Sequence, residues 1–211
     1  MELLKDFIDL FLHLDKHLSE VIQHYGTGTY LILFLIVFCE TGLVVTPFLP
    51  GDSLLFAAGT FAGLGDLDVG LVFTILCAAS ILGDSSNYWV GRLVGRKAFE
   101  SRFIKQEHLL KTQAFYDRHG RKTVVLARFL PILRTFAPFV AGVGVMPYPR
   151  FLMVSVLGSV AWVGLFVCAG YLFGNLTVVR ENFTLVVMAI IALSVMPMVI
   201  ELIKTRRSRP A

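Results

Sequence analysis

The sequence predicts an all-α polytopic membrane protein, and three observations carry this prediction. Of the 211 residues, 56% are apolar and only 16% are charged, against roughly a quarter charged in an ordinary soluble domain. The charged residues lie mostly between long apolar runs. A spanning helix needs about 20 apolar residues, which leaves room for several membrane segments. We therefore expect one membrane domain over residues 1–211 rather than a soluble enzyme with a single core.

The distribution of basic residues predicts the sidedness of the chain. The net charge is +4, and nine of the 19 Lys and Arg residues lie between Arg92 and Lys122. Four more crowd the last eight positions, from Lys204 onward. Because cytoplasmic loops of membrane proteins are enriched in Lys and Arg, both stretches are expected to be cytoplasmic. Basic residues placed this way mark topology, so we expect no nucleic-acid partner.

The N-terminal stretch, residues 1–24, predicts an amphipathic helix. Leucine, isoleucine and phenylalanine recur at helical spacing, with acidic residues and histidines between them. Such a helix lies in the plane of the membrane surface. His13 and His17 stand four positions apart, but no third ligand has suitable spacing, so we expect no metal. The side of the membrane on which this helix lies stays open.

Residues 28–95 predict a re-entrant hairpin followed by a spanning helix. The apolar run from Tyr30 to Phe38 is followed by Glu40 and a breaker-rich segment, residues 46–52, with two prolines and a glycine. A short apolar stretch, residues 53–64, then returns. Because prolines and glycine do not extend a helix, we expect the chain to turn back within the membrane. A spanning helix is expected from about Val69 to Val94.

The second half of the chain repeats this order. Residues 96–122 predict a cytoplasmic amphipathic connection, and residues 123–175 predict a second hairpin, broken by Pro131 and Pro138, and a second spanning helix. Residues 182–203 predict an additional C-terminal transmembrane helix that returns the C-terminus to the cytoplasm.

An internal repeat is visible in short matching segments. Phe-Leu-Pro occurs at residues 48–50 and 129–131, and Ala-Gly follows at residues 58–59 and 141–142. With the connection cytoplasmic, the two hairpins enter from opposite sides. The fold class is therefore an inverted repeat of hairpin plus transmembrane helix, with hairpin tips near the midplane, as in many secondary transporters.

Four charges stand inside apolar runs and form the candidate site: Glu40, Asp52, Arg128 and Arg134. Each would cost about 2.5–3.5 kcal/mol at membrane depth if unpaired, so we expect the acidic hairpin to face the basic one. Two interpretations stay open. The charges are structural ion pairs, or the arginines bind an anionic headgroup through bidentate hydrogen bonds while a carboxyl group exchanges a proton.

A second group follows Gly83 on the first spanning helix. This group consists of residues that are close in sequence and are predicted to line the same cavity as the four charges: Asp84, Asn87, Tyr88 and Arg92. Arg92 has a second interpretation, because a basic residue also marks the cytoplasmic end of a spanning helix.

These motifs resemble the DedA family of bacterial membrane proteins, also called the SNARE-associated or VTT domain family. The resemblance rests on the stretches Phe38-Cys39-Glu40-Thr41-Gly42 and residues 47–55, on Gly83-Asp84 to Gly91-Arg92, and on residues 127–142. It implies two re-entrant hairpins in a bacterial inner-membrane protein. It also implies that Glu40 and Asp52 are the functional acidic pair and that Arg128 and Arg134 are the functional arginine pair.

The family resemblance implies a function in moving lipids across the bilayer. The leading expectation is a flippase for undecaprenyl phosphate. Its arginines are expected to bind the anionic headgroup, and its transport is expected to be linked to the proton motive force. The alternatives are a passive phospholipid scramblase and a structural or chaperone-like membrane protein. We expect no enzyme, because no histidine lies in either hairpin to serve beside the arginines, and no cofactor. A homo-oligomer stays open.

Overall fold

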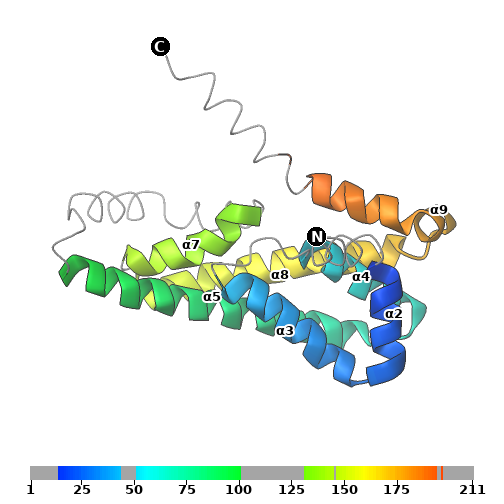
Figure 1. Ribbon diagram of the computed structural model, residues 1–211, viewed down its shortest axis with the longest axis horizontal. Coiled ribbons are helices and arrows are strands. Elements are labelled where there is room, and N and C mark those ends of the chain that lie inside the picture. Colours follow the sequence, from blue (N-terminus) through cyan, green and yellow to red (C-terminus); the bar gives the residue numbers. More distant parts are fainter. Residues whose placement is uncertain (1–13, 44–50, 101–130, 145, 194–195, 197–211) are drawn as a thin grey trace, which may run out of the picture. The chain divides into compact units, whose positions relative to one another are not determined.

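The described part of the chain is helical. The computed structural model describes residues 14–43, 51–100, 131–144, 146–193 and 196, and within these ranges all regular structure is helix (Figure 1). The helices are α2 (Leu14–Tyr25), α3 (Gly28–Gly42), α4 (Gly51–Leu64), α5 (Val69–Glu100), α7 (Pro131–Val143), α8 (Tyr148–Phe173), α9 (Thr177–Glu181) and an apolar helix Phe183–Leu193.

Two of these helices are long and apolar enough to cross a membrane, over Val69–Gly95 and Tyr148–Phe173. By contrast, α3 has 15 residues and α4 has 14, or about 22 Å each at 1.5 Å per residue. This is shorter than the hydrocarbon layer of about 30 Å. Short arms of this kind are compatible with the expected first hairpin, whose turn lies outside the described residues.

The surface of α8 is itself apolar. Met153, Leu157 and Val160 are 65%, 63% and 44% exposed. A soluble protein seldom exposes large apolar side chains in such a row. The row is what a helix in contact with lipid requires, and it supports the membrane class.

The helix boundaries differ from the sequence expectation in two places. Helix α5 continues to Glu100, beyond the expected end near Val94. Pro138 lies inside α7 instead of breaking it. Proline removes one backbone donor and clashes with the preceding turn, yet apolar packing around a buried helix can retain it. Pro131 begins α7, where its missing N–H costs nothing.

Several expected elements fall partly outside the described residues. Of the N-terminal amphipathic helix, α2 is described, and it ends at Tyr25. Of the cytoplasmic connection only the end of α5 is described, and of the C-terminal transmembrane helix only Phe183–Leu193.

The chain divides into two compact units, and they do not coincide with the two sequence repeats. Unit 1 comprises residues 1–30, 50–72 and 165–211, and unit 2 comprises residues 31–49 and 73–164. Each unit therefore takes a short helix from one half of the chain and part of a long helix from the other half.

In unit 1, glycines let α4 approach the end of α8 closely. A methyl group at Gly59 would overlap the backbone of Val167, and one at Gly170 would overlap the backbone of Phe56. Thr60 lies in the same contact, with its Oγ1 3.4 Å from the carbonyl oxygen of Gly170. Small residues at a helix contact permit this backbone approach.

Unit 2 holds α7 against the end of α5 in the same way. A methyl group at Gly142 would overlap the backbone of Tyr88, and one at Gly91 would overlap the backbone of Phe139. In both units the glycine stands three positions after the residue whose carbonyl the partner glycine meets. The helix contacts inside the two units thus have the same spacing.

Candidate functional site

A buried ion pair joins two helices of unit 2. Glu40 on α3 is 1% exposed and Arg134 on α7 is 8% exposed, and the guanidinium Nη2 of Arg134 donates to Oε1 of Glu40. The expectation that an acidic residue of the first hairpin region pairs with a basic residue of the second is met for these two residues. Their functional roles stay a prediction.

Trp162 on α8 lies against the guanidinium of Arg134. The guanidinium carbon of Arg134 lies 4.5 Å from the centre of the Trp162 ring. Trp162 is only 1% exposed. A cation over an indole face gains about 2 kcal/mol or more when desolvated. Arg134 therefore contacts both a carboxylate and an aromatic face.

Asn87 on α5 forms hydrogen bonds with both helices that carry the pair, α3 and α7. Its Nδ2 donates to the carbonyl oxygen of Thr41 at 3.2 Å and to that of Thr135 at 2.6 Å. These are the residues that directly follow Glu40 and Arg134 in the chain. The sequence predicted Asn87 as part of a cavity wall; the structure gives it the contacts of a positioning residue.

The amide oxygen of Asn87 is also buried, and among the described residues no hydrogen-bond donor reaches it. Such an acceptor is costly when unpaired. It marks a place beside the ion pair where a donor, such as water or a protonated acid, would be favourable.

The long helices α5 and α8 meet through a regular antiparallel series of contacts in unit 2. The hydroxyl oxygens of Ser80 and Ser159 lie 3.0 Å apart, and Ser155 donates to Oδ2 of Asp84 at 2.6 Å. One turn further along α5, the rings of Tyr88 and Phe151 stack with centroids 4.7 Å apart. Each step moves four residues forward on α5 and four back on α8, which fixes the register of the two helices.

Asp84, Tyr88 and Arg92 take part in packing contacts on this helix. Asp84 is buried and accepts from Ser155. The hydroxyl of Tyr88 donates to the carbonyl of Met146 and accepts from Nη1 of Arg92 at 2.8 Å. The structure accounts for these three side chains by contacts between helices, and their prediction as cavity lining stays untested.

The other two of the four predicted charges, Asp52 and Arg128, are not part of this described pair. Asp52 is in the first turn of α4 and belongs to unit 1, where it is half-buried. Arg128 lies outside the described residues. Of the four predicted site residues, the structure therefore describes the pairing of Glu40 with Arg134.

Sequence reasoning missed Trp162 as a partner of Arg134 and missed Ser155 as a partner of Asp84. A signal existed for Trp162, because tryptophan is enriched at membrane interfaces and this one stands in the middle of an apolar run. No sequence signal distinguished Ser155 from Ser159, the other serine of α8.

Neither a metal centre nor a disulfide is found in the described part of the chain. No group of three metal-ligating side chains occurs there, and no disulfide involves Cys39, Cys77 or Cys168. Cys77 is buried, whereas Cys168 on α8 is exposed.

The chain is similar to several known membrane proteins. The VTT domain model matches residues 49–172. The chain is 51% identical to Protein DedA of Escherichia coli K12, over 99% of this chain and 97% of that protein. It is 40% identical to an uncharacterized membrane protein of Mycobacterium leprae, over 79% and 76% of the two chains. It is 32% identical to Inner membrane protein YghB of Escherichia coli K12, over 75% and 74%. No solved structure matches the chain.

Proposed function

Because the chain belongs to the VTT domain family, which includes the DedA proteins, we propose that it is a membrane lipid translocase for a phosphate-bearing lipid. The favoured substrate is undecaprenyl phosphate. The observation that carries this proposal is the buried pair of Glu40 and Arg134 in an otherwise apolar helical protein. A charge pair of this kind is expensive in a membrane and marks a functional site by default.

The chemistry of the pair supports a phosphate ligand. The guanidinium of Arg134 is a planar fork that binds carboxylate and phosphate oxygens alike. A lipid phosphate can therefore take the place of Glu40 on Arg134, while Trp162 keeps the guanidinium in position. Asn87 holds the two helices at the distance that the exchange requires.

Charge balance links this exchange to protons. In the resting pair one negative and one positive charge cancel. When an anionic phosphate takes the place of Glu40 on Arg134, the buried carboxylate loses its contact with the guanidinium, which costs free energy. Uptake of one proton by Glu40 removes that cost. We propose that Asp52 and Arg128, the other two predicted residues, form the second acidic and basic positions of the same cycle.

The proposed topology follows the basic residues. The C-terminus and the connection over residues 96–122 face the cytoplasm, and the two hairpins form an inverted repeat in the inner membrane. The side of the N-terminal helix stays open.

The experiment is transport in reconstituted vesicles. Labelled undecaprenyl phosphate is followed across the bilayer with and without an imposed pH gradient, for the wild type and for Arg134→Ala. The matched control is Arg150→Ala, which removes an exposed arginine at the start of α8. We expect Arg134→Ala to lose transport and Arg150→Ala to retain it. Transport by Arg134→Ala at the wild-type rate would remove the headgroup role.

Proton linkage and lipid identity are separate outcomes of the same assay. Glu40→Gln and Asp52→Asn are expected to make the rate insensitive to the pH gradient. A wild-type flux that never responds to the gradient would favour a passive phospholipid scramblase. Recovery of the lipid chemically unchanged is expected, because we propose translocation and no bond cleavage.

A further inference from the structure

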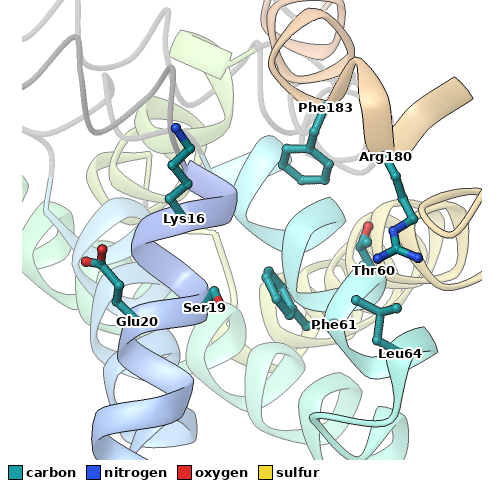
Figure 2. Close-up of a pocket in the computed structure, with 8 residues that line it drawn as sticks. All are labelled: Lys16, Ser19, Glu20, Thr60, Phe61, Leu64, Arg180 and Phe183. Carbon is teal, nitrogen blue, oxygen red and sulfur yellow. The ribbon is translucent and has the colours of Figure 1, made fainter. Parts of the chain in front are cut away.

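A cavity lies wholly within unit 1, and its lining contains none of the residues given a functional role above. It has a volume of about 480 Å³ and is walled by α2, α4, α9 and the start of the helix Phe183–Leu193 (Figure 2). This volume is within the range of ordinary ligand sites, about 300–1,000 Å³. Neither the sequence motifs nor the family comparison assigns a role to it.

Two cations stand on its rim. Lys16 on α2 and Arg180 on α9 are exposed, and within the described residues neither forms an ion pair. Figure 2 places them on opposite sides of the cavity, with the rings of Phe61 and Phe183 between them in this view. Two cations that converge on one cavity from different helices favour an anionic ligand.

Glu20 is the acidic residue of the lining. Its Oε2 lies 3.9 Å from Nδ1 of His17 on the same helix. It stands on the α2 side, one turn from Lys16. With two cations and one carboxylate, the lining keeps a net positive charge, which again favours an anion.

The rest of the lining consists of three apolar side chains and the hydroxyl-bearing Ser19 and Thr60. Phe61 is half-buried, Leu64 is 43% exposed and Phe183 is 6% exposed. The ring of Phe183 lies 6.1 Å from that of Phe56, centre to centre, which anchors this wall in the unit. A free inorganic anion gains nothing from such a surface, whereas the chain of a lipid does.

The α4 wall is firmly placed. Thr60, which also lines the cavity, donates to the carbonyl of Phe56 at 3.1 Å and lies against Gly170 and Gly174 of the α8 end. The opposite wall is the amphipathic helix α2, the kind of helix that lies at the boundary of headgroups and acyl chains. The cavity therefore combines a cationic rim and an apolar floor where a membrane surface is expected.

We infer that this cavity binds a phosphate-bearing lipid, with the phosphate between Lys16 and Arg180 and the start of its chain on Phe61, Leu64 and Phe183. This inference goes beyond the proposed translocation, because binding at the rim of unit 1 requires neither transport nor the Glu40–Arg134 pair.

The test is calorimetric titration of the purified protein in a neutral detergent with dihexanoyl phosphatidic acid. Lys16→Gln and Arg180→Gln are each expected to weaken binding about tenfold, the value of one charge-assisted hydrogen bond. Arg150→Gln is the matched control and is expected to bind like the wild type. Because Lys16 and Arg180 are exposed, both variants are expected to retain the wild-type melting temperature.

The ligand arms separate a lipid from a bare anion. Inorganic phosphate is expected to bind at least tenfold more weakly than dihexanoyl phosphatidic acid, and Glu20→Gln is expected to bind the lipid at least as tightly as the wild type. Equal affinity for inorganic phosphate would overturn the lipid assignment. Wild-type affinity in both Lys16→Gln and Arg180→Gln would overturn the site itself. If Arg134→Ala loses transport but still binds dihexanoyl phosphatidic acid like the wild type, the binding supports the cavity of unit 1 independently of the proposed translocation.

Discussion

The buried pair of Glu40 and Arg134 gives a stability prediction that a double-mutant cycle can test. The perturbations are Glu40→Leu, Arg134→Met and the two changes together. Removing either partner alone leaves one buried charge, which costs about 3–5 kcal/mol. Replacing both by apolar side chains removes the desolvation cost as well, and such replacements are often neutral or stabilising. The double variant is therefore expected to be more stable than either single variant.

The surroundings of the pair refine these magnitudes. In Glu40→Leu the guanidinium keeps its contact with Trp162, 4.5 Å from the ring centre, so the loss should fall at the lower end of the range. Arg134→Met also gives up that contact, worth about 2 kcal/mol, but leaves a carboxyl group that can accept a proton. Both single variants are thus expected to lose stability, by amounts that need not be equal.

The assay is thermal unfolding in detergent, followed by intrinsic fluorescence. For a chain of this length 1 kcal/mol corresponds to about 2–4 °C in melting temperature, so each single variant should lose about 6–20 °C. The double variant should recover more than half of the larger loss. If the two single losses simply add in the double variant, the residues are not energetically coupled, and the ion pair is not what stabilises this part of unit 2.

Three further predictions concern contacts between helices within each unit. Asn87→Leu removes two buried hydrogen bonds and should cost about 1–3 kcal/mol in unfolding free energy; an unchanged melting temperature would show that the clamp on the two helices is dispensable. Gly91→Ala and Gly170→Ala should each cost about 1–3 kcal/mol by overpacking, whereas Gly164→Ala, whose added methyl would meet its nearest neighbour at 3.6 Å, should be neutral; similar melting temperatures for all three would refute the close helix contacts. Ser155→Ala removes a donor from the buried carboxylate of α5 and should cost about 1.5–3 kcal/mol, measured in the same unfolding assay; a loss below 0.5 kcal/mol, taken as roughly the scatter of surface substitutions, would contradict it.

The membrane class and the long helices could be predicted from the sequence because they depend on local composition. The apolar runs Val69–Gly95 of α5 and Tyr148–Phe173 of α8 are long and contain few charged residues. The pairing of Glu40 with Arg134 could also be anticipated, since a charge in an apolar run needs a partner wherever that partner lies in the chain. In each case the physical cost is a property of the residue and its neighbours in sequence.

The contacts that position the pair could not be predicted in this way. Asn87 reaches two carbonyl groups, and Trp162 lies over the guanidinium, only because α3, α5, α7 and α8 meet at a particular register. That register depends on small residues and on alternating contacts along two long helices. No single segment contains this information.

Dependence on contacts between segments distant in sequence also explains why the continuation of α7 through Pro138 and the cavity of unit 1 were not predicted. A proline in isolation favours a break, but the helix α7 continues through it because neighbouring helices supply the packing. Lys16 and Arg180 lie near opposite ends of the chain, so their convergence on one cavity depends on the fold alone.

The central claim is that Glu40 and Arg134 form a working site rather than a structural link. Transport of labelled undecaprenyl phosphate by the double variant Glu40→Leu, Arg134→Met in reconstituted vesicles tests it most directly. We expect a variant that melts close to the wild type and moves no lipid. A double variant that is equally stable and transports at the wild-type rate would contradict the claim.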